Sequence, residues 1–191
     1  MKIKSVLMAS LMTIVSLSSC GSSSKEKVTS EETTPSKTIV CYFSATGTTA
    51  EAAERIAEKT GGVLYEIKPE VAYTDADLDW TDKESRSSLE MQDPEARTAI
   101  GGELPDLTQY EVVFIGYPNW WNTHPTIINT FLESTNLEGK TIVPFMTSGG
   151  STIDNSVQKL HEQYPSLNIH DGILMNHVTD SELETLLTSL D

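Results

Sequence analysis

The sequence predicts an α/β domain built on a doubly wound, five-stranded parallel sheet. Three observations lead to this prediction. Short uninterrupted runs of β-branched and aromatic residues are typical of strands that are buried on both faces. Segments with helical periodicity separate these runs, as in parallel sheets with helices on both faces. Turn-forming or Gly-rich sequences follow three of the runs, at the sheet edge where such folds bind ligands.

Five runs are predicted to be strands. They lie at residues 38–43 (TIVCYF), 63–67, 111–117 (EVVFIGY), 141–146 (TIVPFM) and 168–174. Cys41 falls inside the first run, and we expect it to be a small buried hydrophobic residue. Four segments with helical periodicity accompany them, at residues 49–60, 125–134, 152–164 and 180–190. The first helix is expected to end at the Gly61-Gly62 pair, and the second has Pro125 in its first turn.

Residues 68–107 depart from this alternation and form a long acidic insertion after the second predicted strand. A loop of this length inside a compact domain is usually functional or contains short helices of its own. Its acidic cluster consists of Asp75, Asp77, Asp79, Asp82 and Glu84, with Trp80 among them. The spacing lacks the glycine and the distal glutamate of an EF-hand loop, so a solvated acidic face is favoured over a calcium site. We predict no metal site.

Composition limits the classes of partner. The chain has 191 residues, with 28 acidic and 13 basic side chains and a formal charge of −15. This length suits one domain, and 38% hydrophobic residues are enough for a core. Because phosphate backbones repel such a polyanion, nucleic-acid binding is excluded, and protein partners are expected to offer basic docking surfaces.

The N-terminus has the features of a targeting segment. Lys2 and Lys4 precede an apolar run at residues 6–17, which is too short to span a bilayer. The following Leu17-Ser18-Ser19-Cys20 resembles the lipobox of bacterial lipoprotein signal peptides, which implies lipidation of Cys20 and an anchor in a membrane of the bacterial cell envelope. An ordinary signal peptide with an unrelated cysteine is the alternative. We therefore expect a signal peptide at 1–19, a lipidated cysteine and flexible linker at 20–37, and the folded domain at 38–191.

The loop after the first strand leads directly into a helix. It consists of Ser44, Ala45, Thr46, Gly47, Thr48 and Thr49. Consecutive backbone N–H groups around a glycine, with four hydroxyl groups, form a nest that suits a phosphate. The segment contains no Lys or Arg, so it is neither a P-loop nor a G-x-G-x-x-G motif. A helix cap rich in Ser and Thr is the alternative interpretation.

Two further loops are expected at the same edge. The loop after the third strand contains Pro118, Asn119, Trp120, Trp121 and Asn122. Adjacent tryptophans in a loop suit stacking on a planar ring, although packing against the insertion could account for one of them. The loop after the fourth strand contains Thr147, Ser148, Gly149, Gly150 and Ser151. Its glycines permit close approach of backbone amides to a heterocycle.

These motifs resemble those of the flavodoxin family. YFSATGTT is similar to the phosphate-binding signature, and GYPNWW and TSGGS are similar to the second and third flavin loops of short bacterial members that are often secreted or lipid-linked. The resemblance extends from residue 37 to the C-terminus, and it implies the strand order 2-1-3-4-5 and FMN as the cofactor. It assigns the first loop to the phosphate, the second to the flavin ring and the third to the pyrimidine end of that ring.

The resemblance implies FMN-dependent electron transfer between proteins at a membrane. Two alternatives remain: an NAD(P)H-dependent quinone or flavin reductase on the same fold, and a surface lipoprotein that binds a partner without flavin. An electron carrier is favoured over a reductase because no Lys or Arg near the three loops suits a dinucleotide phosphate. No catalytic residue is predicted. His124, beside the second loop, is more typical of a surface residue at a helix N-terminus than of a proton donor.

Overall fold

The computed structural model describes residues 37–190. The predicted signal peptide, Cys20 and most of the predicted linker lie outside these residues. The strands are β1 (Thr38–Tyr42), β2 (Val63–Glu66), β3 (Val112–Pro118), β4 (Thr141–Thr147), β5 (Asn168–Ile169) and β6 (Ile173–Leu174). The helices are α1 (Thr48–Thr60), α2 (Arg86–Gln92), α3 (Thr126–Ser134), α4 (Asp154–Gln163) and α5 (Asp180–Thr188). None of the helices in this part of the chain is long and apolar enough to cross a bilayer.

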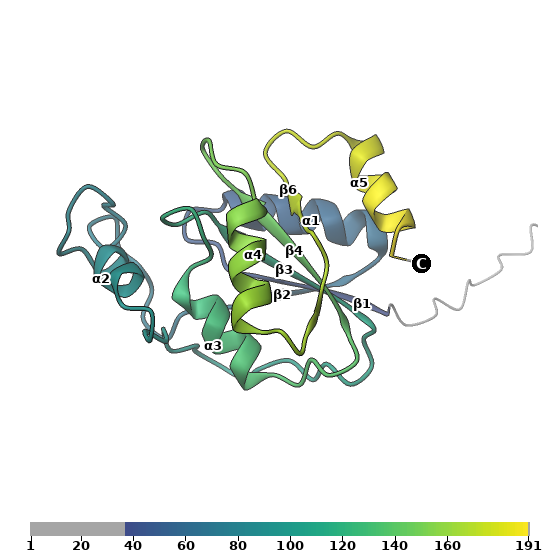
Figure 1. The fold of residues 1–191 in the computed structure, drawn as a ribbon, viewed down its shortest axis with the longest axis horizontal. Coiled ribbons are helices and arrows are strands. Elements are labelled where there is room, and N and C mark those ends of the chain that lie inside the picture. Colours follow the sequence, from purple (N-terminus) through teal and green to yellow (C-terminus); the bar gives the residue numbers. More distant parts are fainter. Residues whose placement is uncertain (1–36, 191) are drawn as a thin grey trace, which may run out of the picture. The chain divides into compact units, whose positions relative to one another are not determined.

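The strands form one parallel sheet in the order β2-β1-β3-β4-β5, which confirms the predicted topology. Figure 1 shows α1 and α5 on one face of this sheet and α3 and α4 on the other. Because both faces are covered, the central strands are buried except at their first or last residues. This is why their sequences show uninterrupted hydrophobic runs instead of the alternation of a half-exposed sheet.

Alternate residues of each central strand enter two separate cores. In β1, Ile39 and Cys41 pack in the core beneath α3 and α4, whereas Val40 packs in the core beneath α1 and α5. In β3, Ile115 and Phe114 are divided between the two cores in the same way. Cys41 is fully buried as predicted, and burial raises the pKa of its thiol. It is therefore a core residue.

The predicted fifth strand is divided into two short pieces. Both β5 and β6 pair with β4 in parallel, but Ile142 is opposite Ile169 and Phe145 is opposite Ile173, so the outer strand has one extra residue between the two pairs. Pro144 lies between these positions. Because the carbonyls of Ile142 and Met146 accept hydrogen bonds from the outer strand, residue 144 also faces it. Proline has no N–H to donate there, which explains the break.

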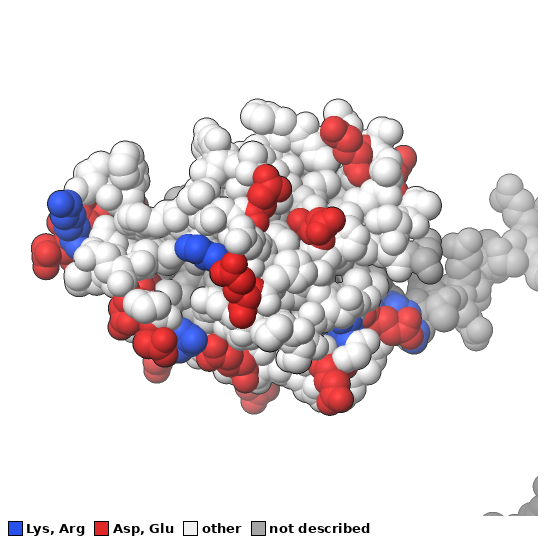
Figure 2. Space-filling view, viewed as in Figure 1, with Lys and Arg blue, Asp and Glu red and all other residues white. Residues whose placement is uncertain are grey.

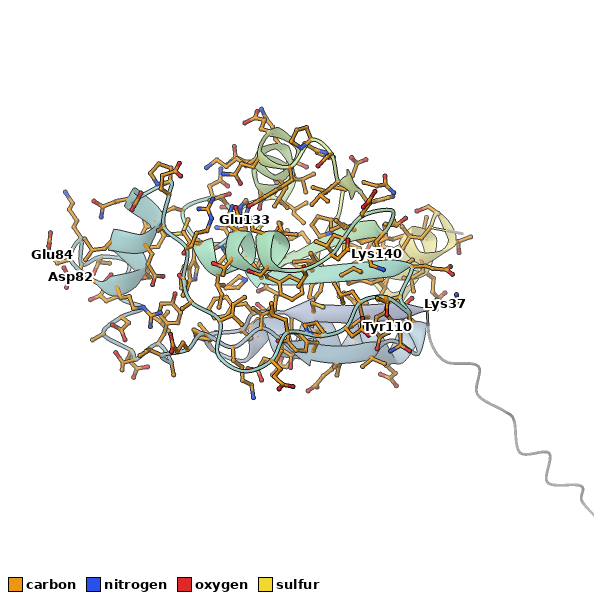
Figure 3. The ribbon with its side chains drawn as sticks, turned by 90° about the horizontal axis from the view of Figure 1, so that it is seen from below. Lys37, Asp82, Glu84, Tyr110, Glu133 and Lys140 are labelled. Carbon is orange, nitrogen blue, oxygen red and sulfur yellow. The ribbon has the colours of Figure 1, made fainter. Side chains whose placement is uncertain are left out.

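The β2–β3 connection (residues 67–111) extends beyond the carboxyl ends of the strands. In Figure 3, Asp82 and Glu84 of this connection lie at the opposite end of the molecule from Lys37, Tyr110 and Lys140, which lie one or two residues before β1, β3 and β4. The connection contains a helix of its own, α2, as the length of the segment suggested. Its base is fixed by an antiparallel bridge between Pro69 and Ile100.

Acidic side chains are spread over the face shown in Figure 2 and are not gathered in a single patch. Several carboxylates of the β2–β3 connection bond to their own turns. Asp77 Oδ2 accepts hydrogen bonds from Thr74 N at 2.8 Å and Thr74 Oγ1 at 2.7 Å, which lowers the pKa of Asp77. No group of three or more His, Cys, Asp or Glu side chains within residues 37–190 could hold a metal ion.

Gly116 of β3 allows Phe145 of β4 to pack directly over the sheet. A Cβ atom at position 116 would lie 2.0 Å from Phe145 Cζ, and both strands are central and parallel here. Gly116→Ala should therefore lower the free energy of unfolding by about 1–3 kcal/mol through overpacking. Urea denaturation measures this change. Gly149→Ala is the matched control, because its Cβ would enter open space. Equal stability of the two variants would contradict this interpretation of the core.

Candidate functional site

Thr147 at the end of β4 connects the three loops that the sequence assigned to a ligand. We call residues 44–49 loop 1, residues 118–122 loop 2 and residues 147–151 loop 3. The carbonyl of Thr147 accepts a hydrogen bond from Asn119 N at 2.7 Å, and its Oγ1 lies 2.8 Å from Thr49 Oγ1. Both threonine side chains are buried. The three loops therefore form one hydrogen-bonded unit at the carboxyl edge of β1, β3 and β4.

Loop 1 combines a helix cap with free backbone amides. Ser44 Oγ accepts hydrogen bonds from Gly47 N at 3.1 Å and Ala50 N at 3.2 Å, and Gly47 has a φ of 95°. This capping satisfies two amides at the start of α1. The N–H groups of Thr46, Thr48 and Thr49 have no hydrogen-bond acceptor among residues 37–190. They lie at the positive end of a 13-residue helix, which is an arrangement that binds anions.

The hydroxyl groups of loop 1 differ in accessibility. The side chains of Thr46 and Thr48 are exposed, and that of Ser44 is half-buried, as is the neighbouring Ala45. The side chain of Thr49, in contrast, is buried and bonds to Thr147. Its hydroxyl contacts that of Thr147, so the exposed hydroxyls of Thr46 and Thr48 are the more accessible ones in loop 1. The backbone amide of Thr49 remains unpaired.

Loop 2 ends in a strained two-residue turn. Trp120 N donates to Thr123 O at 3.0 Å and Thr123 N donates to Trp120 O at 2.9 Å, with Trp121 and Asn122 between them at φ values of 47° and 62°. Two positive φ angles define a type I′ turn. Asn adopts this conformation readily, but Trp does so rarely. The positive φ angles of loop 2 thus occur at residues 121 and 122.

The two adjacent tryptophans have different environments. Trp120 is half-buried, and its ring lies 5.6 Å from that of Phe43 and 5.2 Å from that of Tyr73, edge to face in both cases. Trp120 therefore packs the β2–β3 connection against the sheet. The sequence analysis gave packing against the insertion as the alternative explanation for one of the two tryptophans. Trp121 is 44% exposed at the tip of the turn.

Loop 3 is preorganised by its own side chains. Ser148 Oγ accepts hydrogen bonds from Ser151 N at 2.8 Å and Gly150 N at 3.2 Å, while Ser148 N donates to Asn176 Oδ1 at 2.6 Å. Asn119 Nδ2 of loop 2 donates to Ser151 Oγ at 3.3 Å. Asn119 Oδ1 is buried and has no hydrogen-bond partner. An unpaired buried acceptor costs about 1–3 kcal/mol, so this atom is suited to a ligand that carries an N–H group.

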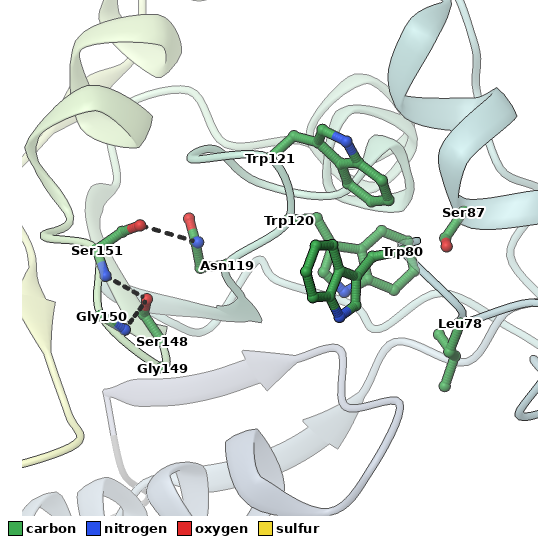
Figure 4. A pocket seen from close by; sticks show the side chains of 10 residues that line it. All are labelled: Leu78, Trp80, Ser87, Asn119, Trp120, Trp121, Ser148, Gly149, Gly150 and Ser151. Atoms are coloured by element: carbon green, nitrogen blue, oxygen red, sulfur yellow. Dashed lines mark hydrogen bonds between the residues drawn. The ribbon is translucent and has the colours of Figure 1, made fainter. Parts of the chain in front are cut away.

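Loops 2 and 3 border a cavity of about 630 Å³ (Figure 4). Its lining residues are Leu78, Trp80, Ser87, Asn119, Trp120, Trp121, Ser148, Gly149, Gly150 and Ser151. None of them is charged, and seven were predicted from the sequence. Loop 1, Pro118, Asn122 and Thr147 do not line the cavity. Loop 1 is connected to it through the bond between Thr49 and Thr147.

The sequence analysis missed the contribution of Leu78, Trp80 and Ser87. All three belong to the β2–β3 connection, which was interpreted as a solvated acidic face. One signal was available: a tryptophan within a run of aspartates is difficult to explain as solvated surface. Trp80 is 75% exposed and lies at the cavity, across from Ser148 to Ser151 in Figure 4.

His124 is buried, contrary to the expectation of a surface residue. Its side chain is 3% exposed, and its Nδ1 lies 3.3 Å from both Thr123 Oγ1 and Ser156 Oγ. Ser156 Oγ in turn donates to the hydroxyl of Tyr117 at 3.0 Å. Burial lowers the pKa of His124 to about 4. The imidazole is thus a neutral part of the core that supports the end of loop 2.

A parallel sheet in the order 2-1-3-4-5, with ligand loops at the carboxyl ends of its central strands, defines the flavodoxin-like class of α/β proteins. The sequence model described as flavodoxin matches residues 37–189. The chain belongs to the flavodoxin family.

Solved structures agree with this assignment. The chain is 52% identical to a candidate flavoprotein from Bacteroides eggerthii DSM 20697, with 81% of this chain and 97% of that chain covered and a TM-score of 0.78. It is 48% identical to a candidate flavoprotein from Bacteroides uniformis ATCC 8492, with 80% of this chain and 98% of that chain covered and a TM-score of 0.76. A flavoprotein from Lactobacillus acidophilus NCFM, solved in complex with FMN, is 25% identical, with 78% of this chain and 97% of that chain covered and a TM-score of 0.61. No curated protein matches the chain.

The backbone strain at Trp121 in loop 2 should lower the free energy of unfolding, which substitution by glycine can test. Glycine adopts a positive φ without steric cost, so Trp121→Gly should raise the free energy of unfolding by about 1 kcal/mol in the absence of ligand. Asn122→Gly should have a smaller effect, because asparagine already tolerates the left-handed region. Urea denaturation of both variants measures the difference. A Trp121→Gly variant that is less stable than Asn122→Gly would show that the indole stabilises the turn.

The buried imidazole predicts a pH dependence of stability. An unfolded histidine titrates near pH 6.5, whereas His124 in the folded protein titrates near 4. Between these values the unfolded state binds more protons, so the free energy of unfolding falls as the pH is lowered, by up to about 1.4 kcal/mol per pH unit.

His124→Gln removes this titration. The free energy of unfolding of the variant should therefore fall less between pH 7 and pH 5 than that of the unaltered protein. Urea denaturation at several pH values provides the comparison. Parallel pH profiles would mean that His124 is not buried in its neutral form.

Proposed function

We propose that this protein binds FMN at loops 1, 2 and 3 and transfers electrons between protein partners. The observation that carries the proposal is the pairing of a nest of free amides in loop 1 with an uncharged, Trp-lined cavity at loops 2 and 3. Both belong to one hydrogen-bonded unit through Thr147. The FMN complex of the Lactobacillus acidophilus relative supports the same cofactor.

Each part of the site suits one part of FMN. The amides of Thr46, Thr48 and Thr49 would hold the phosphate through their dipoles and the orientation of α1, because loop 1 has no cation. The cavity residues of loops 2 and 3 would hold the ring, with Trp121 available for stacking and Asn119 Oδ1 as an acceptor for a ring N–H. Bound FMN supplies the capacity to accept and release electrons.

The remaining assignments follow from the sequence. A protein with a formal charge of −15 is expected to dock on redox partners with basic surfaces, since long-range fields orient such encounters. Lipidation of Cys20 would tether it to a membrane of the bacterial cell envelope and raise its local concentration there. A reductase that uses NAD(P)H is less well supported, because no charged residue lines the cavity.

Loop 1 provides the test of phosphate binding. Gly47 has a φ of 95° with open space at its Cβ position, so Gly47→Ala distorts the backbone of the nest without a side-chain clash. The dissociation constant for FMN should rise by at least about tenfold, equivalent to about 1.4 kcal/mol, whereas that for riboflavin, which lacks the phosphate, should change little. Quenching of flavin fluorescence measures both constants.

Gly139→Ala is the matched control for Gly47→Ala. Gly139 has a φ of 72° and the same open surroundings, but it precedes β4 at the opposite end of that strand from loop 3. Its substitution should lower stability without altering the affinity for FMN. If the unaltered protein does not bind FMN, or if Gly47→Ala weakens FMN and riboflavin equally, the proposed phosphate site is wrong.

A further inference from the structure

We propose that the β2–β3 end of the cavity binds a second ligand beside the flavin: a planar, uncharged aromatic molecule with a ring carbonyl, of the quinone class. The proposal rests on the proposed flavin site, because it assigns the cofactor ring to loops 2 and 3. It concerns the wall formed by Leu78, Trp80 and Ser87, which we call the distal wall.

The two sides of the cavity offer different chemistry. On the side of loop 3, backbone amides and small polar side chains surround Asn119. On the other side, Figure 4 shows Leu78 and Ser87 beyond the indoles of Trp80 and Trp120. The cavity volume of about 630 Å³ lies within the range of about 300–1,000 Å³ that is usual for small-molecule sites. The distal wall is therefore a separate surface for a ring, distinct from the loop 3 amides.

Trp80 provides an unused aromatic face. It is 75% exposed, and its ring makes no aromatic contact within the described part of the chain. The segment that carries it is held in place, since Tyr73 packs against Trp120 and the guanidinium of Arg86 lies 4.0 Å from the centre of the Tyr73 ring. A large exposed indole on a fixed wall of a cavity is suited to stack on a planar ligand.

Ser87 provides an unused hydroxyl group at the same wall. Its side chain is 2% exposed, and its Oγ has no hydrogen-bond partner. The neighbouring buried serines are paired, with Ser85 Oγ donating to Ser88 Oγ at 2.9 Å and Ser88 Oγ donating to Asp82 O at 2.6 Å. A buried hydroxyl without a partner is costly, so Ser87 is expected to donate to an acceptor on the ligand, such as a ring carbonyl.

Charge restricts the ligand to neutral molecules. The lining residues are all uncharged. Residues 75–87, which carry the distal wall, include five acidic and two basic side chains. One of those basic residues, Arg86, is occupied by Glu90 at 2.8 Å and by the carbonyl of Val71 at 2.7 Å. Anionic ligands such as nicotinamide dinucleotides would therefore be repelled, whereas an uncharged quinone would not.

Equilibrium dialysis of the full chain saturated with oxidised FMN tests the proposal with three probes. Menadione is planar, neutral and carries ring carbonyls, 2-methylnaphthalene lacks the carbonyls, and 1,4-naphthoquinone-2-sulfonate is an anion. We expect menadione to bind at least about tenfold more tightly than the sulfonate, a difference of about 1.4 kcal/mol. Ser87→Ala should weaken menadione about fivefold and leave 2-methylnaphthalene unchanged, as expected for loss of one hydrogen bond.

Trp80→Ala should weaken menadione and 2-methylnaphthalene by a similar factor, about tenfold, because stacking does not require a carbonyl. Leu89→Ala is the control, since Leu89 is exposed on α2 and does not line the cavity. The same variants are titrated with FMN, and their affinity for the cofactor should stay within about twofold of the unaltered protein.

The outcomes separate the two proposals. Failure of the unaltered chain to bind FMN overturns the proposed function. Normal FMN binding with no menadione binding, or with binding that Trp80→Ala and Ser87→Ala leave unchanged, overturns the inference about the distal wall. A loss of FMN affinity that matches the loss of menadione affinity also overturns it, because these residues would then belong to the cofactor site.

Discussion

The buried end of β4 is the constraint on which the site depends. Thr147 contacts loop 2 through its carbonyl and loop 1 through its hydroxyl, and loop 3 begins at the same residue. This arrangement is available only because β1, β3 and β4 are adjacent parallel strands whose carboxyl ends meet. A single buried threonine thus converts three loops that are distant in sequence into one preorganised surface. The two cores on either side of the sheet hold the strand ends in register.

The interior of the site is uncharged, whereas the chain as a whole is strongly acidic. Neither loop 1 nor the cavity contains a charged residue, although the chain as a whole has a formal charge of −15. A phosphate there depends on amide dipoles at the start of α1, and its desolvation is offset by hydrogen bonds instead of by an ion pair. The strained backbone at Trp121 fits the same picture, because strain that persists in a fold commonly marks a ligand-binding position.

Much of the fold follows from local sequence, and the exceptions have physical causes. The strands were identified because burial on both faces leaves uninterrupted apolar runs, and loops 2 and 3 were located because they follow such runs. The break between β5 and β6 arises because Pro144 faces the outer strand and has no N–H to donate to it. A hydrophobic pattern does not show which neighbouring strand a residue faces. The burial of His124 and the position of Ser87 at the cavity depend on packing between distant segments. The acidic composition around Trp80 concealed its place at the same cavity.

The most direct measurement of the central claim is a crystal structure of the full chain grown with FMN. Our account predicts the phosphate oxygens within hydrogen-bonding distance of the amides of Thr46, Thr48 and Thr49, with no Lys or Arg in contact, and the ring between loops 2 and 3. A phosphate held by a cationic side chain, or a ring bound outside the cavity that Asn119 and Trp121 line, would contradict it.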